Sequence, residues 1–261
     1  MHVQSLVTRR TAIRFIAAVA GTAIYVRDLA LAAPAASGKF VGKLTFSPLK
    51  TDSGVYQFQL LENYGYMDVG GRMWQAKAGL PTDGASIPSV FWPFIGHPYQ
   101  GLYLDAAVIH DFYCMKENRY RKWQDVHHVF HEAMLANGVG TLEAKLMFFA
   151  VWRFGPRWDI SELIPCTPDP AKGQFCASVA PSGYNVTNMD VISFEQTAEK
   201  AILDDAKKWI EKDNPDPDRL AQYEASLPPL ARGDDTTKFQ GAAKMWYFEN
   251  PYQIPLVEPK D

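Results

Sequence analysis

The stretch AAVIHDFYC at residues 106–114 places His110 directly before Asp111, at the end of a run of small and apolar residues. Four of the six histidines of the chain lie between positions 110 and 131. A histidine whose ring is oriented by a carboxylate can take a proton from water, and histidines and carboxylates also bind divalent cations. This stretch is therefore the candidate catalytic or metal-binding site of the sequence.

Two amphipathic helices are expected to position these residues. Apolar spacing predicts one helix over residues 102–115 and a second over 123–136, joined by the segment MKENRYR. On the second helix, spacings of three and four residues place Asp125, His128 and Glu132 on one face. We expect the two helices to form an antiparallel hairpin in which this face can meet His110.

The point at which the first helix ends decides the pairing of His110. At about 1.5 Å of rise per residue, His110 comes level with Asp125 if the helix stops near Met115. If the helix continues to Asn118, His110 faces His128 instead.

Three other residues of the predicted hairpin, two histidines and a cysteine, are expected to have structural rather than catalytic roles. His127 and His131 form a further pair four residues apart and are interpreted as surface residues. Cys114, one turn beyond His110, is expected to pack as a small apolar residue.

Two mechanisms and one structural alternative fit the candidate residues. In the first, Asp125 orients a neutral His110 as the base for water, and Asp111 holds a divalent cation, calcium. In the second, His110 and Asp111, with His128 or Asp83, bind a transition metal such as zinc that activates water. In the third, His110 and Asp125 are a buried hydrogen-bonded pair that stabilises the hairpin.

The order of the expected elements predicts an α+β fold. Aromatic and β-branched residues alternate over residues 40–78 and predict a small antiparallel β meander. The His–Asp hairpin and a third helix over 141–153 then complete a three-helix core, so that the core domain covers residues 40–160. Residues 161–261 are predicted to be a loop-rich extension with one amphipathic helix near 194–212.

Residues 1–33 are typical of an export signal. Positive residues, an apolar run and small residues in A-x-A spacing follow one another, and the pair Arg9–Arg10 indicates the twin-arginine route. The protein is therefore expected to be periplasmic or secreted. Because Arg27 and Asp28 interrupt the apolar run, no stable transmembrane anchor is expected.

The composition of the chain argues against one class of binding partner. The net charge of −3 and the lack of a basic stripe argue against nucleic acid as a partner. For an exported protein, a lipid or cell-envelope substrate is the expected partner. In an oxidising compartment Cys166 and Cys176, which bracket a short loop, could close a disulfide.

The motifs found so far resemble the bacterial and phage family called domain of unknown function 1353. The resemblance covers roughly residues 40–160 and rests on LPTDGASIPSVFWP, AAVIHDFYC, Asp125 and FFAVWRFGPRW. Members of this family often have tyrosine four residues after the histidine, where this chain has Cys114. The positions that correspond to the family pattern are Thr82, Asp83, Ser86, Pro88, His110, Asp111 and Asp125.

The hairpin also resembles the helix pair of phospholipase A2 enzymes, although no glycine-rich calcium loop precedes it. That resemblance implies His110 as base, Asp111 as calcium ligand and Asp125 as the residue that orients the base. It favours an exported hydrolase that cleaves lipid esters with a divalent cation. The alternatives are a metal-dependent hydrolase of cell-wall peptide or glycan, and a non-enzymatic module of an envelope or phage-derived assembly.

Overall fold

The computed structural model describes residues 38–50, 56–82, 101–163 and 183–240 of the 261-residue chain. The chain divides into two units, Met1–Ala35 and Ala36–Asp261, and all described elements belong to the second. This second unit contains both the predicted core and the predicted extension. The predicted export signal, Asp83 and the Cys166–Cys176 pair lie outside the described residues.

The N-terminal strands form two small antiparallel sheets. One sheet has the order β1–β4–β5 and the other the order β2–β3–β6. The meander expected from the sequence is thus divided between two sheets, because β1 pairs with β4 rather than with its neighbour β2. The strands are β1 (Lys39–Val41), β2 (Phe46–Lys50), β3 (Tyr56–Leu60), β4 (Tyr64–Met67), β5 (Met73–Ala76) and β6 (Pro81–Thr82).

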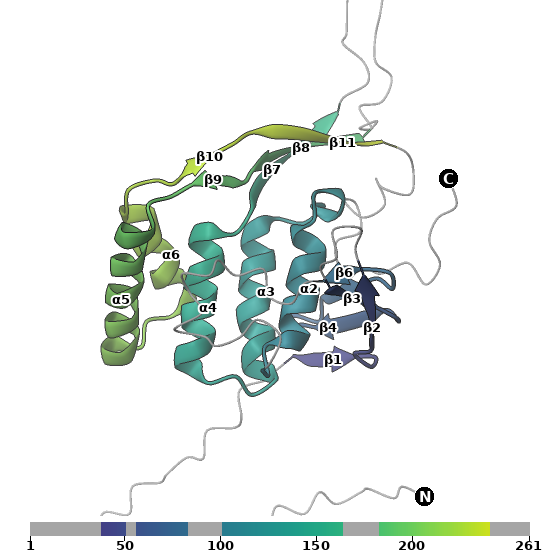
Figure 1. The fold of residues 1–261 in the computed structure, drawn as a ribbon, viewed down its shortest axis with the longest axis horizontal. Coiled ribbons are helices and arrows are strands. Elements are labelled where there is room, and N and C mark those ends of the chain that lie inside the picture. The colour runs from purple at the N-terminus through teal and green to yellow at the C-terminus, as the bar shows by residue number, and fades with distance from the viewer. Residues whose placement is uncertain (1–37, 51–55, 83–100, 164–182, 241–261) are drawn as a thin grey trace, which may run out of the picture. The chain divides into compact units, whose positions relative to one another are not determined.

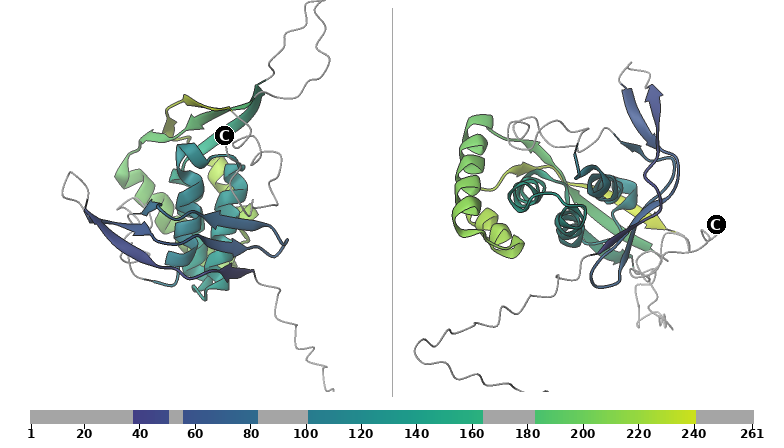
Figure 2. Two further views of the ribbon diagram at one scale, coloured as in Figure 1. Left: turned by 90° about the vertical axis from the view of Figure 1, so that its right-hand side faces the viewer. Right: turned by 90° about the horizontal axis from the view of Figure 1, so that it is seen from below.

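Three helices follow and lie side by side, with α3 between α2 and α4 (Figures 1 and 2). They are α2 (Leu104–Cys114), α3 (Trp123–Ala136) and α4 (Thr141–Phe154), each within two residues of its predicted bounds. A 3-10 turn, η2 (Lys116–Asn118), connects the first two. Nearly all of α4 is buried, which a long run of apolar residues such as LMFFAVW makes favourable.

The C-terminal part has more regular structure than the sequence indicated. The strand order β7–β8–β11 forms a third antiparallel sheet, and β9 pairs with β10. The predicted amphipathic helix is present as α5, and a further helix, α6, follows it. The elements are β7 (Arg157–Leu163), β8 (Gly183–Met189), β9 (Val191–Ser193), α5 (Gln196–Asp213), α6 (Pro217–Ser226), β10 (Ala231–Arg232) and β11 (Asp235–Gln240).

A buried ion network attaches α5 and α6 to α4. The Arg153 side chain, 1% exposed, donates from Nη2 to Glu199 Oε1 of α5 at 2.6 Å and lies 3.3 Å from Glu224 Oε1 of α6. Arg157 donates to the other oxygen of Glu224 at 2.7 Å. Buried charges are tolerated only when they are paired in this way, so the network requires all three helices to be present.

The described elements together make an α+β fold, as the sequence predicts. None of the helices in the described ranges has the length and the apolar character needed to cross a bilayer.

Candidate metal centre

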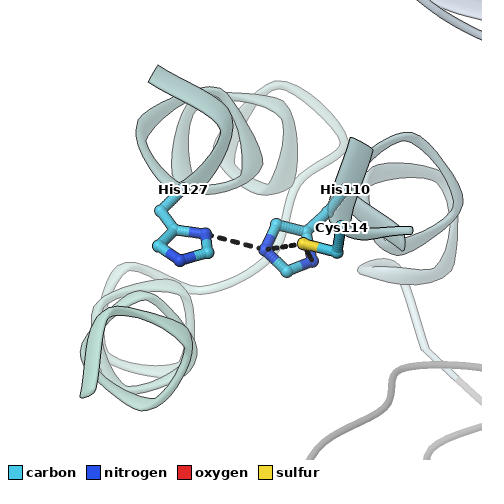
Figure 3. Close-up of side chains that lie close together, drawn as sticks. All are labelled: His110, Cys114 and His127. Carbon is cyan, nitrogen blue, oxygen red and sulfur yellow. Dashed lines mark hydrogen bonds between the residues drawn. The ribbon is translucent and has the colours of Figure 1, made fainter. Parts of the chain in front are cut away.

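Two turns of helix face each other at the centre of the α2–α3 interface. His110 and Cys114 lie one turn apart on α2, and His127 points toward them from α3 (Figure 3). The sequence brings them together because α2 ends at Cys114 and the short η2 turn reverses the chain. His110 therefore comes level with the second turn of α3.

The side-chain atoms of these three residues form a compact group. His110 Nε2 lies 2.9 Å from His127 Nδ1, and Cys114 Sγ lies 3.5 Å from the same His110 nitrogen. One ligand atom from each residue can be chosen so that all three lie within 4.8 Å of one another. Figure 3 shows a His127 ring nitrogen facing His110 and the Cys114 sulfur beside the His110 ring, in contact with both of its nitrogens.

These spacings are close to those of a tetrahedral zinc site. Zinc–nitrogen bonds of about 2.0–2.1 Å and zinc–sulfur bonds of about 2.3 Å separate two nitrogens by roughly 3.4 Å and a nitrogen from a sulfur by roughly 3.6 Å. An ion could therefore replace the proton shared by His110 and His127 after the two nitrogens separate by about a further 0.5 Å. The Cys114 sulfur already has about the required distance from His110 Nε2, although it also lies 3.7 Å from His110 Nδ1 and must shift to share one ion with both imidazoles.

The group is largely enclosed. His127 is fully buried and His110 is 7% exposed, whereas Cys114 is only partly covered. Phe130 packs against the His110 ring, and Trp123 and Trp152 pack against His127. Cys114 is thus the least buried of the three residues, and the hydrophobic walls strengthen electrostatic interactions inside the group.

The pKa values of the two imidazoles are shifted in opposite directions. Burial lowers the pKa of His110, but its interactions with Cys114 and Asp111 more than compensate and raise it to about 10. Burial, followed by the positive charges of His110, Arg157 and Arg232, holds the pKa of His127 well below its usual value. His127 is thus neutral, with a ring nitrogen that can accept a proton or bind a cation.

Asp111 lies beside the His110 ring, on the side away from His127. Its Oδ1 lies 3.6 Å from His110 Nδ1, on the ring nitrogen that does not face His127. Carboxylates in this position orient metal-binding histidines and make them more basic. Asp111 thus lies beside Nδ1 of His110, while Nε2 of the same ring faces His127.

The predicted pairing of His110 with Asp125 is replaced by another. Asp125 Oδ2 accepts a hydrogen bond from Arg72 Nη1 at 2.9 Å, and the aspartate side chain is 44% exposed. The carboxylate belongs to the first turn of α3, on the flank that meets the N-terminal strands. A different face of α3, the one that carries His127, lies against His110.

His128 also lies away from His110. Its Nε2 is 3.4 Å from Asp218 Oδ1 of α6, and its ring contacts Phe148 and Trp152 of α4. Of the residues proposed from sequence, the structure thus brings His110 and Asp111 together, and separates Asp125 and His128 from them. Asp83 lies outside the described residues.

The interpretation of His127 and His131 as surface residues is wrong. They are 0% and 8% exposed, because α3 lies between two helices and buries a wider arc than an outer helix does. Cys114 does contact the core, but its sulfur also contacts His110. The spacing of His110 and Cys114, four residues apart on one helix face, is the sequence signal that could have indicated a shared site.

Comparison with known proteins agrees with the sequence motifs. The model of a family described as "Protein of unknown function (DUF1353)" matches residues 58–151, the segment that contains His110, Cys114 and His127. The similarity to the DUF1353 family covers just over a third of the chain. The proposed centre therefore lies within the DUF1353 segment, whereas Arg153 and the C-terminal elements lie beyond it.

Two proteins from Sinorhizobium fredii (strain NBRC 101917 / NGR234) are similar to this chain, and both are described as uncharacterised proteins. The first, y4iH, is 48% identical over 99 residues, which are 38% of this chain and 41% of the relative. The second, y4jT, is 36% identical over 149 residues, 56% of this chain and 44% of the relative. The chain thus spans less than half the length of either relative. No solved structure matches it.

Proposed function

We propose that this chain is an exported metal-dependent hydrolase whose ion is bound by His110, Cys114 and His127. The observation that carries the proposal is the convergence of two imidazole nitrogens and one thiol within 4.8 Å. Imidazole and thiolate ligands favour zinc over calcium, which takes oxygen ligands. Zinc is therefore the cation that we propose, in place of the calcium of the first mechanism.

Three protein ligands leave one position of a tetrahedral ion for water or substrate, which is the arrangement of catalytic zinc sites. Such an ion lowers the pKa of a bound water to about 7 and so supplies hydroxide at neutral pH. Within the chain, His127 offers a neutral nitrogen, and Asp111 orients the His110 ring. The partly covered Cys114 side of the centre is where a substrate would approach.

This geometry supports the metal-dependent alternative better than the phospholipase A2-like one. The latter requires a carboxylate on His110 from the neighbouring helix, and Asp125 is hydrogen-bonded to Arg72. We therefore propose cell-wall peptide or glycan as the substrate class, in the periplasm or outside the cell. The twin-arginine-like leader supports this location, since that route exports proteins that have already folded.

Metal analysis and a substrate panel test the proposal. The reduced full chain is loaded with zinc, its metal content is measured, and it is assayed on peptidoglycan fragments and phospholipid vesicles. We expect about one zinc per chain and cleavage of peptidoglycan that is lost on chelation and in His127→Gln. The neighbouring variant His128→Gln is the matched control and should keep both properties.

Three results would count against the proposal. They are the absence of bound zinc, cleavage that chelators do not affect, and equal behaviour of the two histidine variants. Calcium-dependent cleavage of the vesicles would favour the phospholipase A2-like alternative instead.

A further inference from the structure

The far edge of the His127 ring rests on the protein backbone. Nδ1 faces His110, whereas the buried Nε2 has no hydrogen-bond partner among the described residues. That edge lies against Gly155, at the end of α4: a methyl group added to Gly155 would stand 3.0 Å from both Cε1 and Nε2. No second hydrogen bond fixes the ring, which is held by packing against Gly155 on this edge and against Trp123 and Trp152.

The backbone at Gly155 is held by one side chain of the C-terminal part. Arg232 of β10 donates from Nη1 to the Gly155 carbonyl at 3.0 Å and from Nη2 to the Arg153 carbonyl at 2.6 Å. The same Nη1 donates to the Met189 carbonyl, at the end of β8, at 2.8 Å. One guanidinium group thus fixes the end of α4 to the strands that follow it.

From these contacts we infer that Arg232 is a positioning residue for His127, acting through the Gly155 backbone. The inference rests on the proposed function, since it assigns to Arg232 the alignment of one metal ligand. It also assigns a role to a segment outside the DUF1353 match: β10 holds in place the surface against which the ligand packs.

Arginine is suited to this role because its planar group presents several donors in a fixed geometry. Lysine offers the same charge but a single flexible donor atom, and cannot bridge three carbonyls in the same way. Replacement of Arg232 should therefore let the end of α4 move and allow the His127 ring to turn. Loss of partners that orient a metal ligand typically weakens metal binding by about 10–100-fold.

The first experiment compares zinc affinity in the full chain by competition with a chelator. Arg232→Met should bind zinc about 10–100-fold more weakly than the wild type, and Arg232→Lys should fall between the two. The control is Arg219→Met in α6, because the guanidinium of Arg219 stacks on Trp209 and its backbone lies in another element. It should bind zinc as the wild type does.

The second experiment uses metal-free protein and so separates the inference from the proposed function. The ring N–H shared by His110 and His127 is followed by ¹H–¹⁵N NMR of the imidazoles. Its signal should shift or exchange faster in Arg232→Met, recover in part in Arg232→Lys, and stay unchanged in Arg219→Met. If the wild type binds no zinc, the proposed function fails while this measurement still tests the role of Arg232.

An unchanged signal in folded Arg232→Met overturns the inference, as does an equal change in Arg219→Met. If Arg232→Met does not fold, the same comparison is made with Arg232→Lys. If Arg232→Lys shows both wild-type imidazole signals and wild-type zinc affinity, the inference about Arg232 is overturned.

Discussion

His110 Nε2 on α2 lies 2.9 Å from His127 Nδ1 on α3, at the centre of the buried helix interface. The histidine of the His–Asp pair is thus joined to a second imidazole, with the Cys114 sulfur 3.5 Å away. A buried polar group of this kind can serve to stabilise the hairpin or to bind an ion. The predictions below separate these roles.

Cys114→Ser should remove the thiolate ligand while leaving the fold intact. The cobalt-substituted wild type should show sulfur-to-cobalt charge-transfer absorption, which the variant should lack. Zinc affinity should fall by more than about 100-fold, the upper end of the effect of losing an outer partner. Absorption spectra and chelator competition measure both effects. A charge-transfer band that persists in the variant would assign the sulfur ligand elsewhere.

Asp125→Asn separates the two enzymatic hypotheses. In this structure the substitution removes an ion pair between Arg72 and a half-exposed carboxylate, which contributes at most about 1 kcal/mol. Zinc content and cleavage should therefore match the wild type. Measurement of both, beside the urea midpoint, checks this. Loss of cleavage with normal zinc content would show that Asp125 takes part in catalysis after all.

The stability of the metal-free protein should fall in mild acid because of His131. Burial, with the nearby charges of Lys145 and His128, lowers the pKa of His131 from 6.5 to about 4. Between these values the unfolded chain binds a proton that the native chain does not, so the free energy of unfolding decreases as pH falls. The full loss, reached near pH 4, is about 3 kcal/mol.

Urea unfolding at several pH values measures this loss. His131→Leu should show a smaller decrease between pH 6.5 and 4 than the wild type. His128→Gln removes only the smallest of the three causes of the lowered His131 pKa, so it should reduce the slope much less than His131→Leu does. If both variants lose the same part of the slope, the pH dependence has another origin.

Arg153→Met should be strongly destabilising, because the buried carboxylates of Glu199 and Glu224 would lose the positive charge with which they pair. Removing one partner of a buried ion pair costs about 3–5 kcal/mol. The control is Lys208→Met, which breaks the exposed pair with Asp205 and should have no measurable effect. Urea midpoints compare them. Similar midpoints for both variants would mean that the network contributes little to stability.

Local sequence patterns predicted the elements better than they predicted the site. The helices α2 to α5 follow from apolar periodicity, which is a property of neighbouring residues. The start of α6 also has a local signal, because Asp216 caps the helix and Pro217 begins it, although the predicted extension contains only one helix.

The partners of His110 depend instead on long-range packing. Asp125 has the spacing of a helical partner, and only the rotation of α3 against α2 shows that it meets Arg72. His127 appeared to be a surface residue because its burial comes from α4, a separate helix. The pairing of β8 with β7 and β11 likewise joins segments far apart in sequence.

The Arg153 network also bears on where the chain can be truncated. The DUF1353 match ends at residue 151, two positions before this arginine, while the carboxylates that neutralise it lie on α5 and α6. A recombinant fragment cut at the end of the match would expose the apolar surface of α4 that those helices cover. The segment shared with the family is thus shorter than the stretch that buries α4, and homology alone is a poor guide to the boundaries of a soluble fragment.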